Sequence, residues 1–66
     1  MPRWTSRNNP TNEDAQLLRI DRYRLRRLIH RFKQYLGGAD SIEIDIDTGD
    51  VYGPNDEPLG NLHDEP

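Results

Sequence analysis

The sequence predicts an α+β domain: one long amphipathic helix packs against a two- or three-stranded antiparallel β-meander, and a disordered N-terminal arm precedes the helix. Two observations predict this class. Apolar residues recur at helical spacing through residues 12–36, and no Pro or Gly interrupts them. After two consecutive glycines, residues 41–47 change to strict apolar and polar alternation, which is typical of a half-buried strand. With 66 residues, the chain is long enough for one small domain.

The predicted organisation has three parts. Residues 1–11 form a flexible basic arm, residues 12–62 form the single helix and hairpin domain, and residues 63–66 form an acidic tail. In the arm, Trp4 is the one large side chain that could be buried. It could pack loosely on the domain, or it could insert into a partner, since chain ends of this composition are usually mobile.

The helix predicted for residues 12–36 has start and stop signals. Thr11 or Asn12 can cap its beginning, and acidic residues follow in the first turn, where carboxylates suit the helix dipole. Gly37 can close its end in the left-handed conformation. The apolar stripe consists of Ala15, Leu18, Leu25, Leu28, Ile29, Phe32, Tyr35 and Leu36. From Leu18 onward these positions fall in an arc of roughly 120° at ~100° per residue, the width of a core-facing stripe.

The second half of the chain predicts a hairpin. Isoleucines at positions 42, 44 and 46 point to one face of the first strand, and acidic residues point to the other. A β-branched residue such as Thr48 resists positive φ, so we expect a three-residue loop that ends in a bulge at Gly49 and pairs Ile44 with Tyr52. Residues 59–62 could add a short third strand.

Charge is divided sharply along the chain. Residues 1–37 carry nine Lys and Arg and three Asp and Glu, which gives +6. Residues 38–66 carry nine acidic residues and no Lys or Arg, which gives −9. The two halves could neutralise each other, within one chain or across a dimer, or one half could present its field to a partner.

Arginines of the helix are the leading candidates for recognition. Arg outnumbers Lys by eight to one, and the planar guanidinium makes directional contacts with carboxylate and phosphate alike. The candidate partner-binding residues are Trp4, Arg19, Arg22, Tyr23, Arg24, Arg26, Arg27 and Arg31. The opposite possibility is an acidic hairpin surface that imitates the phosphates of nucleic acid, made of Glu43, Asp45, Asp47 and Asp50.

Catalytic and metal-binding motifs are poorly matched. The triplet of residues 47–49 spells the sequence around an aspartic-protease carboxylate, but a chain of 66 residues leaves little to build a substrate cleft. The acids near this turn resemble a calcium loop, except that Gly49 and Asp50 stand in reversed order. The chain has no Cys, no Ser–His arrangement and no Gly-rich phosphate loop. We therefore expect no enzymatic activity, no cofactor and no metal site.

The function that the sequence predicts is a small non-enzymatic binding module that docks on a larger protein and modulates it, as a regulator or inhibitor does. The alternative is a nucleic-acid-binding regulator that uses the arginine-rich helix. Because few apolar residues follow the helix, we also expect a homodimer or a stable complex. No apolar run reaches the ~20 residues of a membrane span, and no secretory signal begins the sequence. We therefore expect a cytoplasmic protein with no membrane partner.

Overall fold

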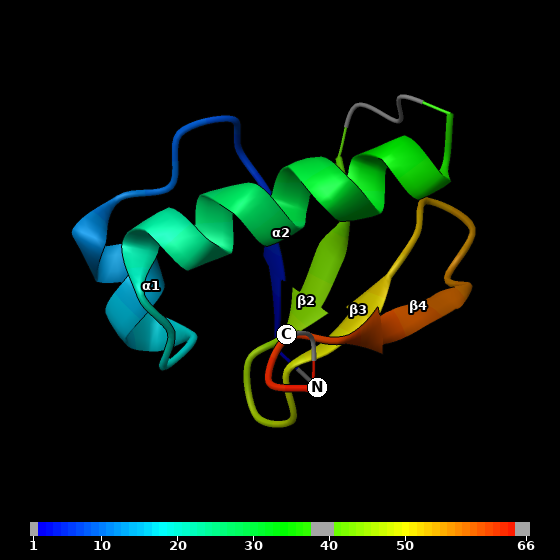
Figure 1. Ribbon diagram of the computed structural model, residues 1–66. Helices are drawn as coiled ribbons and strands as arrows, with labels where there is room; N and C mark the ends of the chain where they lie inside the picture. The colour runs from blue at the N-terminus through cyan, green and yellow to red at the C-terminus, as the bar shows by residue number, and fades with distance from the viewer. Residues whose placement is uncertain (1, 38–40, 65–66) are drawn as a thin grey trace.

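Four strands and two helices make up the protein, which we describe from a computed structural model covering residues 2–37 and 41–64. In chain order the elements are β1 (Arg3–Thr5), α1 (Asn12–Leu17), α2 (Arg22–Tyr35), β2 (Glu43–Asp45), β3 (Asp50–Tyr52) and β4 (Pro58–Asn61). The strands form one antiparallel sheet in the order β1-β2-β3-β4. Helix α2 crosses one face of this sheet, and α1 lies at one end of α2 (Figure 1). The α+β class is confirmed, and the third strand expected at 59–62 is β4.

The prediction of one continuous helix over residues 12–36 is wrong, because the chain turns between α1 and α2. Arg19 adopts a left-handed φ of 56°. The N–H groups of Arg19 and Ile20 then donate to the carbonyls of Gln16 and Ala15, at 3.2 and 3.0 Å. This pair of bonds is the Schellman arrangement that closes a helix, usually at a glycine. An arginine takes the glycine position here, so composition alone did not mark the break.

Helix α2 begins with its own cap. The Asp21 side chain accepts the N–H of Arg24 at 3.1 Å, which satisfies one of the free donors of the first turn. The helix ends at Tyr35, and Gly37 follows with a φ of 71°, close to the predicted stop.

The prediction of a disordered N-terminal arm is wrong for the segment that forms β1. Trp4 pairs with Ile44 of β2, and 7 % of its surface is exposed. Ser6 extends the pairing: its N–H donates to the carbonyl of Ile42, and its hydroxyl accepts the N–H of Ile42, both at 2.9 Å. Burial of the indole and these backbone bonds place β1 at the edge of the sheet.

The hairpin register differs by one residue from the prediction. Ile44 pairs with Val51, and the predicted partner Tyr52 pairs with Glu43. Gly49 has the expected positive φ of 81°, but its N–H donates to the carbonyl of Asp45 at 2.8 Å. The loop between β2 and β3 therefore consists of the four residues 46–49 rather than three.

The core lies between α2 and the sheet. Its buried apolar side chains are Trp4, Ala15, Leu18, Leu25, Leu28, Ile29, Phe32, Ile42, Ile44, Val51 and Leu62. The predicted stripe is therefore buried except at its end. Tyr35 is 63 % exposed and contacts Phe32 edge-on, with ring centroids 5.8 Å apart. The predicted tail at 63–66 lies partly outside the described residues; His63 and Asp64 belong to a turn after β4.

Candidate functional site

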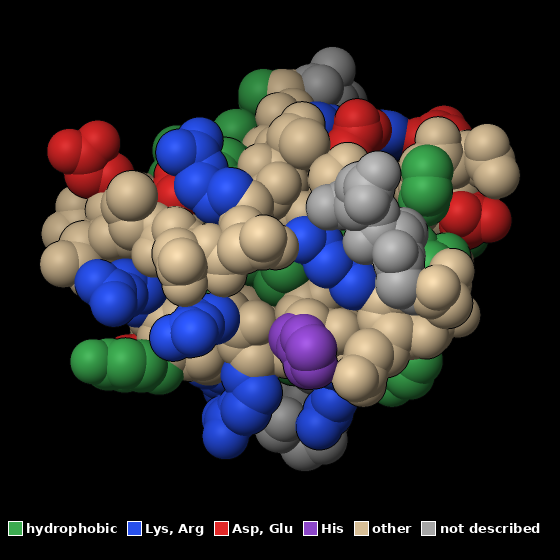
Figure 2. Space-filling view, turned by 90° about the horizontal axis from the view of Figure 1, so that it is seen from above, with side chains coloured by type: hydrophobic (Ala, Val, Ile, Leu, Met, Phe, Trp, Pro, Cys, Tyr) green, Lys and Arg blue, Asp and Glu red, His purple; other side chains and the backbone are tan. Residues whose placement is uncertain are grey.

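The outer face of α2 carries a concentration of positive charge. Its sequence, RYRLRRLIHRFKQY, contains five Arg and one Lys and no acidic residue. The apolar positions of α2 face the sheet, so the long basic side chains are left on the opposite side. Figure 2 looks onto this side and shows Lys and Arg side chains gathered over it, with Asp and Glu near the rim.

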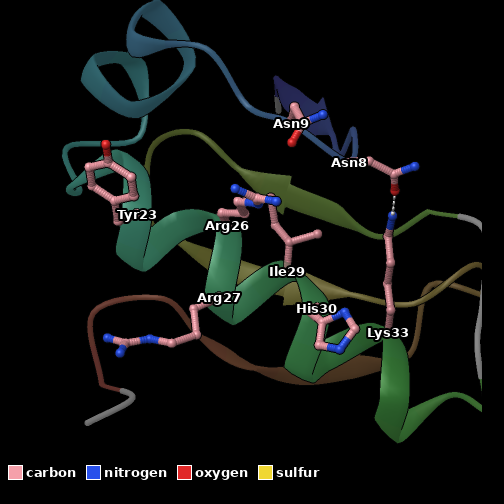
Figure 3. Close-up of a pocket in the computed structure, with 8 residues that line it drawn as sticks. All are labelled: Asn8, Asn9, Tyr23, Arg26, Arg27, Ile29, His30 and Lys33. Atoms are coloured by element: carbon pink, nitrogen blue, oxygen red, sulfur yellow. Dashed lines mark hydrogen bonds between the residues drawn. The ribbon is translucent and has the colours of Figure 1, made fainter.

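An open hollow of about 550 Å³ lies on this face, between α2 and the loop that joins β1 to α1. Helix α2 contributes Tyr23, Arg26, Arg27, Ile29, His30 and Lys33 to its lining. The loop contributes Asn8 and Asn9, which stand across from the helix (Figure 3). Three of these eight residues are Lys or Arg and none is acidic. The hollow therefore favours a negatively charged occupant.

Contacts within the hollow define its two walls. The Lys33 ammonium donates to Oδ1 of Asn8 at 3.2 Å, which ties the loop to the helix. Nε2 of His30 lies 3.1 Å from the side-chain nitrogen of Gln34, one turn further along α2. Tyr23 is 72 % exposed, as its position away from the apolar stripe predicts. The site thus combines charged, polar and aromatic groups from one helix and one loop.

The buried carboxylate of Asp14 fixes the loop wall from behind. Its two oxygens accept the indole N–H of Trp4 at 3.0 Å and the backbone N–H of Thr11 at 2.8 Å. Arg7 Nε lies 3.6 Å away. The Asp14 N–H in turn donates to the Thr11 hydroxyl, which completes a capping box. Burial raises the pKa of Asp14, but the hydrogen bonds and the Arg7 charge outweigh it, so the pKa lies below its ordinary value.

Only part of the predicted arginine set meets at the hollow. Arg26 and Arg27 line it, and Arg22 lies beside it with its guanidinium carbon 5.5 Å from the Tyr23 ring centroid. In the part of the chain that the structure describes, no carboxylate lies within ion-pair distance of these three arginines. Their guanidinium groups therefore face solvent with their charge unneutralised by described acids.

The remaining predicted residues lie elsewhere. Arg19 points to the β2–β3 loop, where it donates to the carbonyls of Ile46 and Asp47 at 3.4 Å. Arg24 is half-buried and Arg31 is exposed, and neither lines the hollow. Trp4 is buried in the core, so its indole is not on the surface as a partner-inserting residue would be.

Most carboxylates of the predicted acidic surface form hydrogen bonds or ion pairs within the chain. Asp45 is 5 % exposed, and its carboxylate accepts the N–H groups of Asp47 and Thr48 at 2.8 and 3.1 Å. Hydrogen bonds from the side chains of Asn61 and Thr48 lower the pKa of Asp50. Asp47 is exposed. Asp45 therefore acts as a turn-forming residue rather than as a surface charge, which corrects its predicted place on the solvent side of the strand.

Glu43, another residue of this surface, is paired with an arginine of the N-terminal strand. Arg3 forms ion pairs with Glu43, at 3.3 Å, and with Asp56. Its guanidinium carbon also lies 4.1 Å from the centroid of the Tyr52 ring. These contacts lie on the sheet face opposite α2, because residues 3, 43 and 52 alternate with the core residues of their strands.

Sequence reasoning missed Asn8 and Asn9, because a loop wall depends on where the flanking elements dock. The available signal was the alternation Arg3-Trp4-Thr5, which places an aromatic residue on one face of a short strand and so fixes where the next loop begins.

The described residues contain no group of three His, Asp or Glu side chains placed to hold a metal ion. Over residues 2–37 and 41–64, no helix is both long and apolar enough to cross a membrane. No model of a known protein family matches the chain, and no curated protein or solved structure is significantly similar to it.

Proposed function

We propose that this chain is a small non-enzymatic binding module, which docks the outer face of α2 on an acidic region of a larger protein and so modulates it. One observation carries the proposal: the hollow beside α2 has a basic lining with no acidic residue. Arg and Tyr are also the residue types that most often dominate the binding energy of protein interfaces.

Whether each charged group already has a partner within the chain supports α2, rather than the acidic sheet face, as the recognition surface. Arg22, Arg26 and Arg27 can contact a partner without first leaving a carboxylate of the described chain. Glu43 and Asp50, in contrast, would have to give up internal bonds. A partner's carboxylates gain directional contacts with guanidinium groups that one helix face already gathers.

Nucleic acid is the second possible partner, because phosphate is attracted by the same cations. Two features favour protein. The Asn8 loop is bonded to Lys33 beside α2, so the presented element is wider than the single helix that a major groove admits. In addition, one aromatic ring lines the hollow, and Arg22 already contacts it, whereas single-stranded sites stack successive bases on several rings.

Comparative capture from the native host tests the proposal. Wild type is compared with Arg26→Ala/Arg27→Ala and with a charge control, Asp47→Asn/Asp64→Asn, after nuclease treatment. We expect one protein to be retained by wild type and by the control but lost by the arginine variant, since exposed arginines can be replaced without unfolding the chain. Retention that needs nucleic acid, or that is lost only in the control, overturns the proposal.

A further inference from the structure

We propose that the hollow between α2 and the Asn8–Asn9 loop binds a short extended acidic peptide segment of the partner, and that Asp14 is the positioning residue that holds the loop wall in place. This inference rests on the proposed function and names the chemistry that the same face recognises. The proposed site includes the Asn8–Asn9 loop as a second wall, in addition to the face of α2.

Size and charge define the occupant. A volume of about 550 Å³ lies within the ~300–1,000 Å³ of ordinary ligand pockets, so the hollow takes a few side chains rather than a flat protein surface. The positive lining comes from Arg26, Arg27 and Lys33, with no acidic residue beside them. Carboxylates are therefore the complementary groups.

Spacing along α2 favours an extended segment. Arg26 and Lys33 are seven residues apart, which is ~10 Å along the helix axis at ~1.5 Å per residue. An extended peptide covers that distance in three to four residues at ~3.3 Å each, and every second side chain faces the same way. Two acids separated by one residue lie ~6.6 Å apart on one face of such a segment, and the long side chains of Arg26 and Lys33 can cover the remaining few ångströms to meet both.

The loop wall supplies groups that suit a peptide backbone. Lys33 occupies Oδ1 of Asn8, so the amide nitrogen of that side chain is left to donate to the occupant. Asn9 lines the same wall with a further amide (Figure 3). Side-chain amides both donate and accept, as the N–H and C=O groups of an extended segment require.

Asp14 controls where this wall stands. Its carboxylate joins Trp4 at one end of the loop to Thr11 at the other, and Arg7, within the loop, lies against it. Removing the carboxylate therefore breaks the side-chain link between the two ends of the segment that carries Asn8 and Asn9. The lining residues of α2 stay in place, because they are held by the helix and its core contacts.

Binding of fluorescein-labelled hexaglutamate to the full chain tests the site, with hexalysine and a thymidine oligonucleotide of equal charge as competitors. We expect Arg26→Ala/Arg27→Ala to weaken the peptide roughly tenfold or more and Asn8→Ala/Asn9→Ala to weaken it severalfold. Arg19→Ala, which removes a cation outside the hollow, should leave affinity within about twofold.

A matched pair tests the positioning role. Asp14→Asn and Thr11→Ala both disturb the capping box, but only the first removes the carboxylate from Trp4 and Arg7. We expect Asp14→Asn to lower hexaglutamate affinity, and Thr11→Ala to leave it unchanged. Both are measured where circular dichroism shows the folded state to be saturated, so stability loss alone cannot produce the difference.

Three outcomes overturn the inference. Unchanged peptide affinity in the asparagine double variant removes the loop from the site, and equal effects of Asp14→Asn and Thr11→Ala remove the positioning role. Stronger competition by the oligonucleotide than by unlabelled hexaglutamate assigns the hollow to nucleic acid. A last combination separates the two proposals. If capture of the partner still requires Arg26 and Arg27 while the loop variants bind peptide normally, the proposed docking through α2 is supported and the proposed peptide site is rejected.

Discussion

The two charged faces of this molecule differ less in how many charges they carry than in what those charges touch. On the outer sheet face, Arg3 bridges Glu43 and Asp56, and Asp50 accepts bonds from neighbouring side chains. On the outer face of α2, no described carboxylate pairs with Arg26 or Arg27. Three carboxylates of the acidic face are thus engaged within the chain, whereas these two arginines of the basic face have no described carboxylate partner.

The comparison teaches that a charge count along a sequence does not identify a binding surface. The halves of the chain carry +6 and −9, which makes the acidic half the more conspicuous one. The folded chain does not follow this charge count, because β1 brings Arg3, a basic residue of the first half, onto the acidic sheet face formed by the second half.

The largest expected effect comes from the residue that attaches β1. Trp4→Ala removes a buried ring from the core and should cost about 3–5 kcal/mol of unfolding free energy. It should also separate Arg3 from Glu43 and so erase the difference between the faces. Urea unfolding measures the loss, with the exposed Tyr35→Ala as the aromatic control; comparable losses in the two variants contradict the burial of Trp4.

Acidification should weaken the fold through the carboxylates that the fold uses. The pKa values of Asp14 and Asp50 are lowered in the folded state, so their stabilisation is present above the unfolded value of ~3.9 and is lost as the pH falls through the folded values. The unfolding free energy should therefore decline progressively below about pH 5. Asp14→Asn should flatten part of this decline, whereas Arg26→Ala/Arg27→Ala should leave its slope unchanged. An identical slope in Asp14→Asn would show that this carboxylate does not contribute.

A moderate gain is expected at the break between the helices. Arg19 holds a left-handed φ of 56°, which costs a residue with a side chain roughly 1 kcal/mol relative to glycine. Arg19→Gly should raise the unfolding free energy by up to that amount, reduced by the loss of its two long bonds to the β2–β3 loop. Differential scanning calorimetry would show the higher Tm; a lower Tm would mean that those bonds outweigh the backbone strain.

The smallest expected effect is at the centre of the acidic face. Arg3→Ala leaves Glu43 and Asp56 without their cation, so the urea midpoint should fall slightly, as is usual for exposed ion pairs. The same measurement on Arg26→Ala/Arg27→Ala should show no fall. If the arginine pair of α2 stabilises the fold as much as Arg3 does, the contrast between the faces is lost.

Local pattern predicted much of the fold and little of the site. The buried face of α2, the exposure of Tyr23 and the end of the helix near Gly37 follow from spacing and composition. The break at Arg19 did not, because a left-handed arginine has no compositional mark. Asp21 was an available signal, as an N-cap residue inside an otherwise continuous pattern.

Long-range contacts account for the rest. Strand β1 has three residues, and its partner lies about 40 positions later in the chain, so no window of sequence contains both. The hollow depends on the same contact, because its loop wall starts at the end of β1 and is tied down by Asp14. The arginines could be named from the sequence, but the wall opposite them could not.

The pairing of β1 with β2 also imposes an order on folding. The first strand is synthesised before both helices, yet it can join the sheet only after β2 exists. Contacts of such high sequence separation form late, because closing the long intervening loop costs entropy before any pairing is gained. Helix α2 and the hairpin of β2 and β3 can form from nearby residues. We therefore expect the basic helix to be exposed before its loop wall arrives, and selectivity for the proposed peptide to be acquired only when the first strand docks.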